Sequence, residues 1–181
     1  MSDLSFRTAT NHDAAALVEL VTSAYRGEAS RAGWTTEADI LDGQRVDAEE
    51  IIATLAKEHS EILVAERESH LVACAHVADE EGHGYFGMFA VSPVEQGNGV
   101  GKEVLREAEL LASQRWGVTT MLMTVIDCRE ELIAFYLRRG YRRTGTKRPF
   151  PYGDERFGIP RRDDLQFEVL EKLLVSTSAE A

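Results

Sequence analysis

The sequence predicts an α/β fold in a single domain. Apolar runs with strand-like alternation are interspersed with runs whose apolar residues recur every three to four positions, as on one face of a helix. The chain has 181 residues, of which 44% are apolar and 28% charged, enough for one sizeable core. We therefore expect one domain over residues 1–175 and a flexible tail over residues 176–181.

The first half of the chain contains most of the expected strands. Asn11 or Asp13 can cap a first helix, Thr36 a short helical turn, and Asp47 a second helix. The expected elements are strand 4–9, a helix ending near residue 25, helical turn 37–41, helix 47–58, and strands 61–66, 70–77 and 83–91.

The second half begins with a glycine-rich turn that leads from strand 83–91 into a helix. Further apolar runs and turn residues follow it. The expected elements are a helix from residue 102, strand 118–125, helix 129–138, strand 141–146, a loop over 148–160 and strand 165–170.

The glycine-rich turn is the most informative feature of the chain. Gly97, Gly99 and Gly101 separate the apolar strand from the helix. Glycine permits a positive φ and lets a ligand approach the main chain closely. The N–H groups at the start of the helix then form a site for a phosphate-bearing ligand.

Two phosphate-binding patterns fit this turn poorly. For a Walker A loop, Gly101 and Lys102 fit, but Gln96 stands where the first glycine belongs. Glu103 also replaces the hydroxyl that binds Mg²⁺. For a dinucleotide fingerprint the glycines have the wrong spacing, and Asp127 only loosely matches the acidic residue after the next strand.

A third pattern, [Q/R]-x-x-G-x-[G/A], is matched by Gln96, Gly99 and Gly101. Downstream, residues 135–141 read F-Y-L-R-R-G-Y and match an F-Y-x-x-x-G-[FY] segment. Together, in this order, the two motifs resemble those of the GNAT family of N-acetyltransferases. One departure is Arg129, since the family often has an asparagine seven residues before the tyrosine.

The resemblance covers about residues 4–174 and implies the fold of acyl-CoA N-acyltransferases. That fold is a mixed, mostly antiparallel sheet of about seven strands, flanked by helices and splayed between its fourth and fifth strands. Acetyl-CoA would be the acyl donor. It would be held by main-chain groups of strand 83–91 and of the glycine-rich turn, and by the basic cluster within residues 138–148. The residues expected to bind it are Phe89, Ala90, Val91, Gln96, Gly97, Asn98, Gly99, Val100, Gly101, Lys102 and Arg139.

The resemblance also implies the catalytic groups. Tyr136 would donate a proton to the departing sulfur, and a phenol remains protonated at neutral pH. Histone-acetylating relatives place a glutamate where this chain has Tyr85. Because strand alternation puts Tyr85 on the same face as His83 and Phe89, the expected base is His83 or water beside Tyr85. Asp127 is a further candidate, although a helix-capping role fits it better.

Two aromatic-bearing loops, around residues 25–45 and 149–158, are the segments that set acceptor specificity in this family. The residues expected to contact the acceptor are Tyr25, Trp34, Glu37, Arg45 and Tyr152. Glu37 can meet an ammonium group, whereas Arg45 can bind a carboxylate and so favour an amino acid. The aromatic residues can equally pack the loops down or form a homodimer interface.

The composition of the chain restricts the classes of partner and cofactor that we expect it to bind. The net charge of −11 argues against general nucleic-acid binding. No apolar run is long enough to span a membrane, and the N-terminus lacks the pattern of a secretory signal. The two cysteines, Cys74 and Cys128, are expected to be free thiols, and the expected location is the cytoplasm. The scattered histidines do not predict a metal site.

The sequence thus predicts an acetyl-CoA-dependent N-acetyltransferase that acts on a primary amine of a small molecule or a peptide. Direct attack in a ternary complex is expected, since neither thiol has an activating context. A coenzyme-binding module without turnover and a P-loop nucleotide-binding protein are the alternatives.

Overall fold

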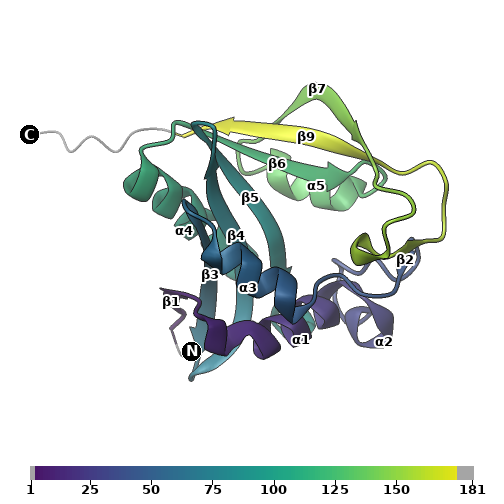
Figure 1. The fold of residues 1–181 in the computed structure, drawn as a ribbon, viewed down its shortest axis with the longest axis horizontal. Coiled ribbons are helices and arrows are strands. Elements are labelled where there is room, and N and C mark those ends of the chain that lie inside the picture. Colours follow the sequence, from purple (N-terminus) through teal and green to yellow (C-terminus); the bar gives the residue numbers. More distant parts are fainter. Residues whose placement is uncertain (1–2, 175–181) are drawn as a thin grey trace, which may run out of the picture.

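The computed structural model describes residues 3–174 and contains a seven-stranded sheet in the order β1-β3-β4-β5-β6-β9-β7 (Figure 1). Its strands are β1 Ser5–Thr8, β3 Ser60–Arg67, β4 His70–Glu80, β5 His83–Val91, β6 Thr120–Ile126, β7 Arg142–Pro149 and β9 Gln166–Leu173. A separate pair consists of β2 Leu41–Asp42 and β8 Ile159–Pro160. The helices are α1 Ala14–Tyr25, α2 Gly27–Ser30, α3 Ala48–Ala56, α4 Val100–Trp116 and α5 Glu130–Leu137, and the 3₁₀ turns are Asn11–Asp13, Pro93–Glu95 and Glu155–Phe157.

The centre of the sheet is where strand pairing changes. Among the described strands, β5 and β6 form the parallel pair and the other pairs are antiparallel. The parallel pair joins only Gly84 to Met121 and Tyr85 to Leu122. Beyond these residues the strands diverge (Figure 1). The expected mixed sheet, splayed between its fourth and fifth strands, is therefore confirmed.

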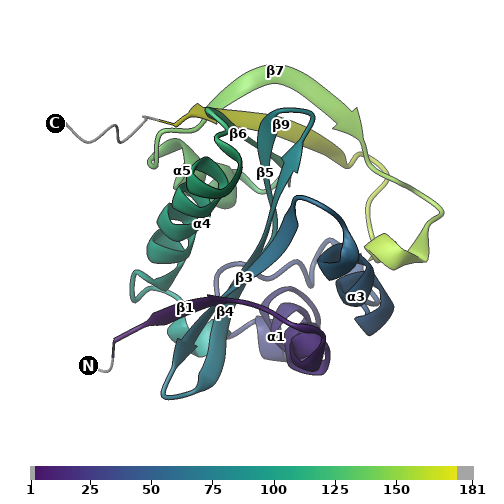
Figure 2. The ribbon, with the colours of Figure 1, turned by 60° about the vertical axis from the view of Figure 1, so that its left-hand side comes forward.

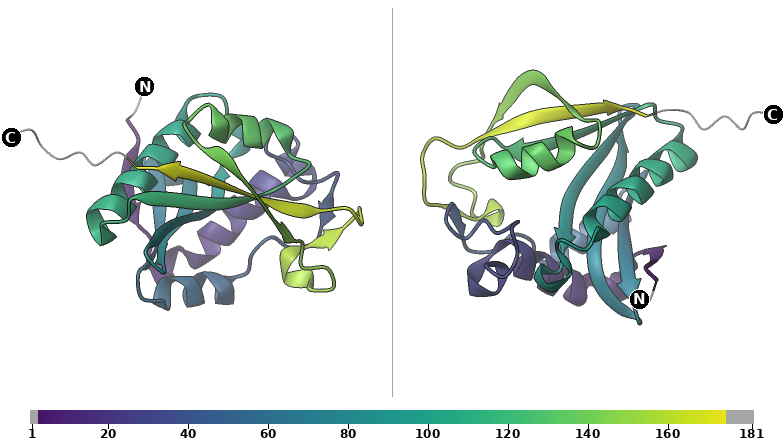
Figure 3. Two further views of the ribbon diagram at one scale, coloured as in Figure 1. Left: turned by 90° about the horizontal axis from the view of Figure 1, so that it is seen from above. Right: turned by 180° about the vertical axis from the view of Figure 1, so that it is seen from behind.

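The helices cover the two faces of the sheet in different pairs. Helices α4 and α5 lie on one face and α1 and α3 on the other (Figures 2 and 3). The first face carries a core that includes Phe86, Phe89 and Ile133, and the second a core that includes Leu17 and Ile51. Both cores contain fully buried aliphatic side chains, and they fix the helices that flank the opening between β5 and β6.

Strand β5 contains a bulge that changes which side chains share a face. Its register with β4 shifts between Cys74 and His76, and Met88 has a φ of 46°. After the bulge, Phe89 lies on the same face as Phe86, with ring centroids 5.2 Å apart. The expectation that Phe89 shares a face with Tyr85 is therefore wrong.

The segment before α3 contains an expected turn and an unexpected strand. Residues 37–41 form the expected single hydrogen-bonded turn, in which Leu41 N–H donates to the Glu37 carbonyl at 2.8 Å. Thr36 does cap this turn, since its hydroxyl accepts from Ala38 N–H at 3.2 Å. The chain then enters β2, which pairs with β8 in the C-terminal loop. This pairing across the molecule had no local sequence signal.

The other elements lie close to their expected positions. Asp47 caps α3 by accepting from Glu50 N–H at 2.8 Å.

Cys74 and Cys128 are free cysteines, as expected. Within residues 3–174, no helix is both long enough and apolar enough to cross a membrane. The expected tail, residues 176–181, lies outside the described residues.

Candidate active site

The glycine-rich turn presents main-chain N–H groups at the start of α4. Gly99 is the N-cap residue, with a φ of 81°, and no side chain caps the helix there. A Cβ added to Gly97 or Gly99 would meet no heavy atom within 4 Å. The first N–H groups of a helix have no partner within it. The turn therefore has the open space and the unused donors that an anionic group requires.

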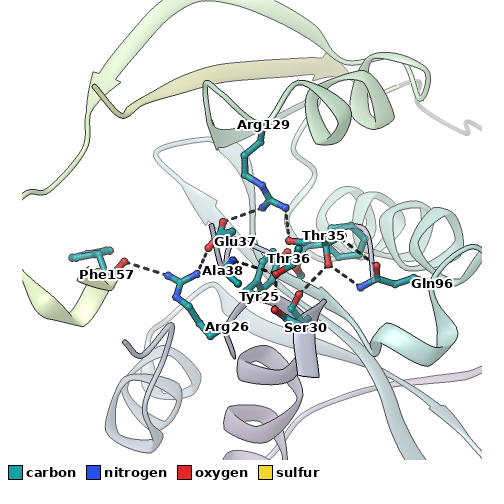
Figure 4. A network of polar contacts seen from close by, with 12 residues as sticks. Tyr25, Arg26, Ser30, Thr35, Thr36, Glu37, Ala38, Gln96, Arg129 and Phe157 are labelled. Carbon is teal, nitrogen blue, oxygen red and sulfur yellow. Dashed lines mark hydrogen bonds and ion pairs between the residues drawn. The ribbon is translucent and has the colours of Figure 1, made fainter. Parts of the chain in front are cut away.

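The side chain of Gln96 ties this turn to the loop after α2. Its Oε1 accepts from the N–H groups of Trp34 at 2.8 Å and Thr35 at 3.3 Å. Its Nε2 donates to the Thr35 hydroxyl at 2.8 Å and to the Val91 carbonyl at 2.9 Å (Figure 4). Gly33 leaves room for this amide, because a Cβ there would collide with it. The side chain of Gln96 thus acts as a cross-link within the protein.

The edge of β5 that faces β6 is open from Phe86 onward. Met88 and Phe89 fall in the register shift and pair with neither neighbouring strand. The Phe89 carbonyl accepts a hydrogen bond from the Tyr25 hydroxyl. Gly101 of α4 lies close behind, since a Cβ there would be 3.1 Å from the Phe89 ring. An extended ligand can therefore run between β5 and β6 toward Phe89.

A cavity of about 490 Å³ lies at the inner end of this opening. Six of the predicted site residues line it: Tyr25, Glu37, Arg45, Tyr85, Phe89 and Tyr136. Three of these, Tyr25, Glu37 and Arg45, were predicted to contact an acceptor. Its apolar wall consists of Met123, Val125, Ile126, Phe150, Phe157 and Phe167. The volume suits a small molecule.

Tyr136 lies on α5 with a ring that is only 4% exposed. It packs against Phe86, Phe89 and Tyr141, at centroid distances of 6.3, 6.3 and 6.0 Å. Burial raises the pKa of Tyr136 well above its usual value. The hydroxyl is therefore protonated at neutral pH, as a proton donor must be.

The residues predicted as bases lie in different surroundings. His83 is exposed at the start of β5 and does not line the cavity. Asp127 bonds to Lys147 at 3.2 Å, outside the cavity. Tyr85 does line the cavity, and burial raises its pKa. Glycine at position 87 leaves space for its hydroxyl.

His76 is a cavity residue that the sequence did not single out. It lies on β4, with its ring centroid 5.4 Å from that of Tyr85. Its Nε2 is 2.7 Å from the Ser60 hydroxyl. Burial lowers the pKa of His76 to about 4, so the ring is neutral at neutral pH. Only alternation along β4 could have placed it, and that pattern does not distinguish a cavity from a core.

Glu37 is buried and paired, which changes its expected role. Its carboxylate bonds to Arg26 and, at 3.0 Å, to Arg129 (Figure 4). Burial alone would raise the pKa of Glu37, but the charges of Arg129, Arg26 and Arg45 outweigh it and hold the pKa below its usual range. The carboxylate that was predicted to bind a substrate ammonium is therefore already paired with two arginines.

Arg129 stands where the family often has asparagine. Besides Glu37, it donates to the Thr35 carbonyl, and its guanidinium lies 5.5 Å from the centroid of the Tyr25 ring. It thus connects the start of α5 to the loop that Gln96 also holds. The departure from the motif has a structural role that the sequence pattern alone did not reveal.

The remaining predicted residues fall outside the large cavity. Trp34 is 40% exposed, lies 5.7 Å from the Phe135 ring and lines a smaller cavity of about 310 Å³ beside Arg129. Tyr152 packs its own loop, donating to the Arg162 carbonyl at 3.1 Å and accepting from Leu165 N–H at 2.8 Å. Neither residue lines the large cavity.

Lys102 lies in the first turn of α4, and Arg139 lies just after the end of α5. The guanidinium of Arg139 stacks 3.6 Å from the Phe135 ring centroid and donates to the Phe135 carbonyl at 2.7 Å. The side chain of Lys102 is exposed. Within the described part of the chain, no group of three or more His, Cys, Asp or Glu side chains is arranged to hold a metal ion.

Comparison with solved structures finds the same fold in acetyltransferases. The ribosomal-protein-alanine N-acetyltransferase of Brucella melitensis is 21% identical, with a TM-score of 0.69 over 94% of this chain and 99% of that one. The yncA protein of Salmonella typhimurium, solved with acetyl-CoA, is 20% identical, with a TM-score of 0.67 over 98% of both chains. The paia N-acetyltransferase of Thermoplasma acidophilum, solved with coenzyme A, is 16% identical, with a TM-score of 0.66 over 94% and 99%.

Sequence comparison addresses the family directly. No curated protein sequence is significantly similar to the chain. The sequence profile of the acetyltransferase (GNAT) family, however, matches residues 15–141, which contain the glycine turn, the open edge of β5 and Tyr136. The chain therefore belongs to the GNAT family of acetyltransferases.

Proposed function

We propose that this protein is an acetyl-CoA-dependent N-acetyltransferase that transfers an acetyl group to a primary amine by direct attack in a ternary complex. The observation that carries the proposal is one continuous path. It runs from the uncapped glycine turn, along the unpaired edge of β5, to a cavity beside Tyr136.

The chain offers separate groups for separate parts of the coenzyme. Main-chain N–H groups of residues 97–102 have the donors and the open space for a pyrophosphate. The open edge of β5 around Phe89 offers main-chain groups for the amides of the pantetheine arm. Two solved structures of the same fold, yncA and the paia N-acetyltransferase, contain acetyl-CoA and coenzyme A, which supports the choice of donor.

The reaction needs a neutral amine and a proton for the leaving group. Acetyl-CoA supplies an activated acetyl thioester: an N–C bond forms, the C–S bond breaks and the sulfur takes up a proton. Tyr136 supplies that proton from its buried hydroxyl. Main-chain N–H near Phe89 stabilises negative charge on the carbonyl oxygen. Water beside Tyr85 and His76, two neighbouring polar residues that line the cavity, would remove the amine proton.

A covalent route through a thiol is disfavoured by the state of both cysteines. Burial raises the pKa of Cys74 to about 12 and also raises that of Cys128. A cysteine nucleophile needs a lowered pKa. Direct attack by the acceptor therefore fits this chain better than transfer through an acyl-cysteine.

Calorimetric titration with acetyl-CoA tests the proposal, with ATP–Mg²⁺ and NADH as controls. We expect micromolar binding of acetyl-CoA alone, followed by release of thiol in the presence of an amine from a panel. No binding of acetyl-CoA would overturn the proposal. Binding without thiol release from any amine would support the alternative, a coenzyme-binding module that has lost turnover because no glutamate stands at Tyr85.

A further inference from the structure

One end of the large cavity carries an excess of positive charge. Three guanidinium groups, those of Arg26, Arg45 and Arg129, line it beside a single buried carboxylate, Glu37. All three lower the pKa of that carboxylate through their charges, although burial opposes them. The other two acidic lining residues, Glu50 and Glu80, are exposed.

Arg45 differs from the other two arginines in having no protein partner. Arg26 pairs with Glu37 and also donates to the Phe157 carbonyl at 3.4 Å. Arg129 is held by Glu37 and the Thr35 carbonyl. Arg45, by contrast, makes no hydrogen bond or ion pair within residues 3–174. Its guanidinium lies over the face of the Tyr25 ring, 5.7 Å from the ring centroid. Its donors are therefore available to a ligand in the cavity.

Tyr25 sets the distance between Arg45 and the proposed reaction centre. Its hydroxyl contacts the Phe89 carbonyl, while Arg45 lies over its ring. The guanidinium and the carbonyl thus both lie beside the same tyrosine side chain. A ligand that reaches both carries its amine and its anionic group only a few bonds apart.

We infer that the acceptor is a free amino acid with an apolar side chain, whose carboxylate binds Arg45. This inference rests on the proposed function and names its substrate class. The apolar wall of the same cavity, which includes Phe150 and Phe167, receives the side chain of the acceptor. Since the one buried carboxylate of the cavity, Glu37, is paired with two arginines, it does not hold the acceptor's amine as an ammonium.

A matched panel of acceptors tests this inference in the full chain with acetyl-CoA. The panel consists of L-methionine, L-methioninamide and 3-(methylthio)propylamine, together with the corresponding L-phenylalanine series. We expect kcat/KM for the free acids to exceed that for the amides and the decarboxylated amines at least 10-fold. Equal or faster turnover of the amines that lack a carboxylate would overturn the inference and leave the proposed function standing.

An Arg45→Gln variant supplies the second arm. We expect it to lower kcat/KM for the free acids at least 10-fold, with little change for the decarboxylated amines and unchanged affinity for acetyl-CoA. Arg106→Gln is the matched control, because Arg106 is exposed on α4 and bonds to Glu107. An equal loss in Arg45→Gln for every acceptor, or the same loss in Arg106→Gln, would contradict the assignment.

Direct binding separates failure of the inference from failure of the proposed function. With coenzyme A present, N-acetyl-L-methionine is titrated into the wild type and into Arg45→Gln. We expect binding by the wild type and at least 10-fold weaker binding by the variant. Binding of acetyl-CoA without any binding of this product or turnover of the panel would overturn the inference alone. Absence of acetyl-CoA binding would overturn the proposed function.

Discussion

The hydroxyl of Tyr136 is the side-chain group on which the proposed chemistry depends most. Aromatic rings surround it, and its raised pKa keeps the proton on the oxygen until a strong base such as a thiolate forms nearby. A proton donor with these properties acts on the leaving group and contributes little to coenzyme affinity.

Replacing Tyr136 by phenylalanine should lower kcat about 100-fold or more, because a general acid contributes roughly that factor. Acetyl-CoA affinity, measured by calorimetry, should change little. Tyr141→Phe is the matched control. It removes a hydroxyl that donates to Glu109 at 2.9 Å outside the cavity, so it should lower stability and leave kcat near that of the wild type. Unchanged kcat in Tyr136→Phe would exclude its role as proton donor.

His76 should make the protein acid-sensitive. Its pKa is about 4 in the folded protein and about 6.5 in an unfolded chain. Between these values the unfolded chain binds a proton that the folded protein does not, so stability falls as the pH drops from about 6.5 toward 4. The loss should reach about 1–3 kcal/mol.

Urea unfolding at pH 7.5, 5.5 and 4.5 measures this loss. His76→Gln should flatten the pH dependence while costing some stability at pH 7.5 through its contact with Ser60. The exposed His12, changed to Gln, supplies the baseline. An unaltered pH dependence in His76→Gln would show that other groups cause the acid sensitivity.

At the scale of elements, two loops far apart in the sequence are joined at one amide. Gln96 bonds to Trp34, Thr35 and Val91, so the end of β5, the glycine turn and the loop after α2 are held together. The position of the N–H groups at the start of α4 therefore depends on a residue that need not itself touch a ligand.

Gln96→Ala should destabilise the protein by about 1–3 kcal/mol, because the part-buried Thr35 N–H and Val91 carbonyl lose their side-chain partner. It should also weaken acetyl-CoA binding, since the glycine turn loses its support. Denaturant unfolding and calorimetry measure the two effects. Gln114→Ala, at an exposed position on α4, is the control and should change neither. If Gln96→Ala weakened binding without lowering stability, the side chain would contact the coenzyme directly instead of supporting the turn.

The sequence predicted the glycine turn and α5 because each has local signals, namely closely spaced glycines and a motif that contains Gly140. It did not predict the bulge at Met88, because a positive φ at a non-glycine residue leaves no local signal. As a result the face of Phe89 was wrongly assigned. The pairing of β2 with β8 was missed for a similar reason, since it joins residues more than a hundred positions apart.

At the scale of the whole molecule, the ion network around Glu37 joins segments that no local pattern connects. Arg26 follows α1 directly, and Arg129 precedes α5, 92 positions from Glu37 in the sequence. The sequence could indicate the residue types of an acceptor pocket. It could not indicate that Glu37 forms ion pairs with two arginines while Arg45 stays unpaired, because these pairings depend on the tertiary arrangement.

Glu37→Gln should destabilise the protein by about 3–5 kcal/mol, since it leaves two buried guanidinium groups without their counter-ion. Thermal and urea unfolding would show it as a lower midpoint. Glu28→Gln is the control: its carboxylate pairs with Arg31 but is 91% exposed, so little change is expected. A loss below 1 kcal/mol in Glu37→Gln would mean that water or other groups compensate these charges.

The sheet consists of two halves that are joined through two residue pairs, Gly84–Met121 and Tyr85–Leu122, which act as a hinge between them. Main-chain amides of β5 beyond the hinge, in residues 86–91, have no partner strand on the β6 side and should exchange with deuterium faster than those of β4. A ligand lying along that edge would act as a missing strand and close the hinge. Amide exchange measured with and without acetyl-CoA should therefore slow at residues 86–91 and at the facing part of β6, so that the coenzyme serves as a removable structural element as well as a reactant.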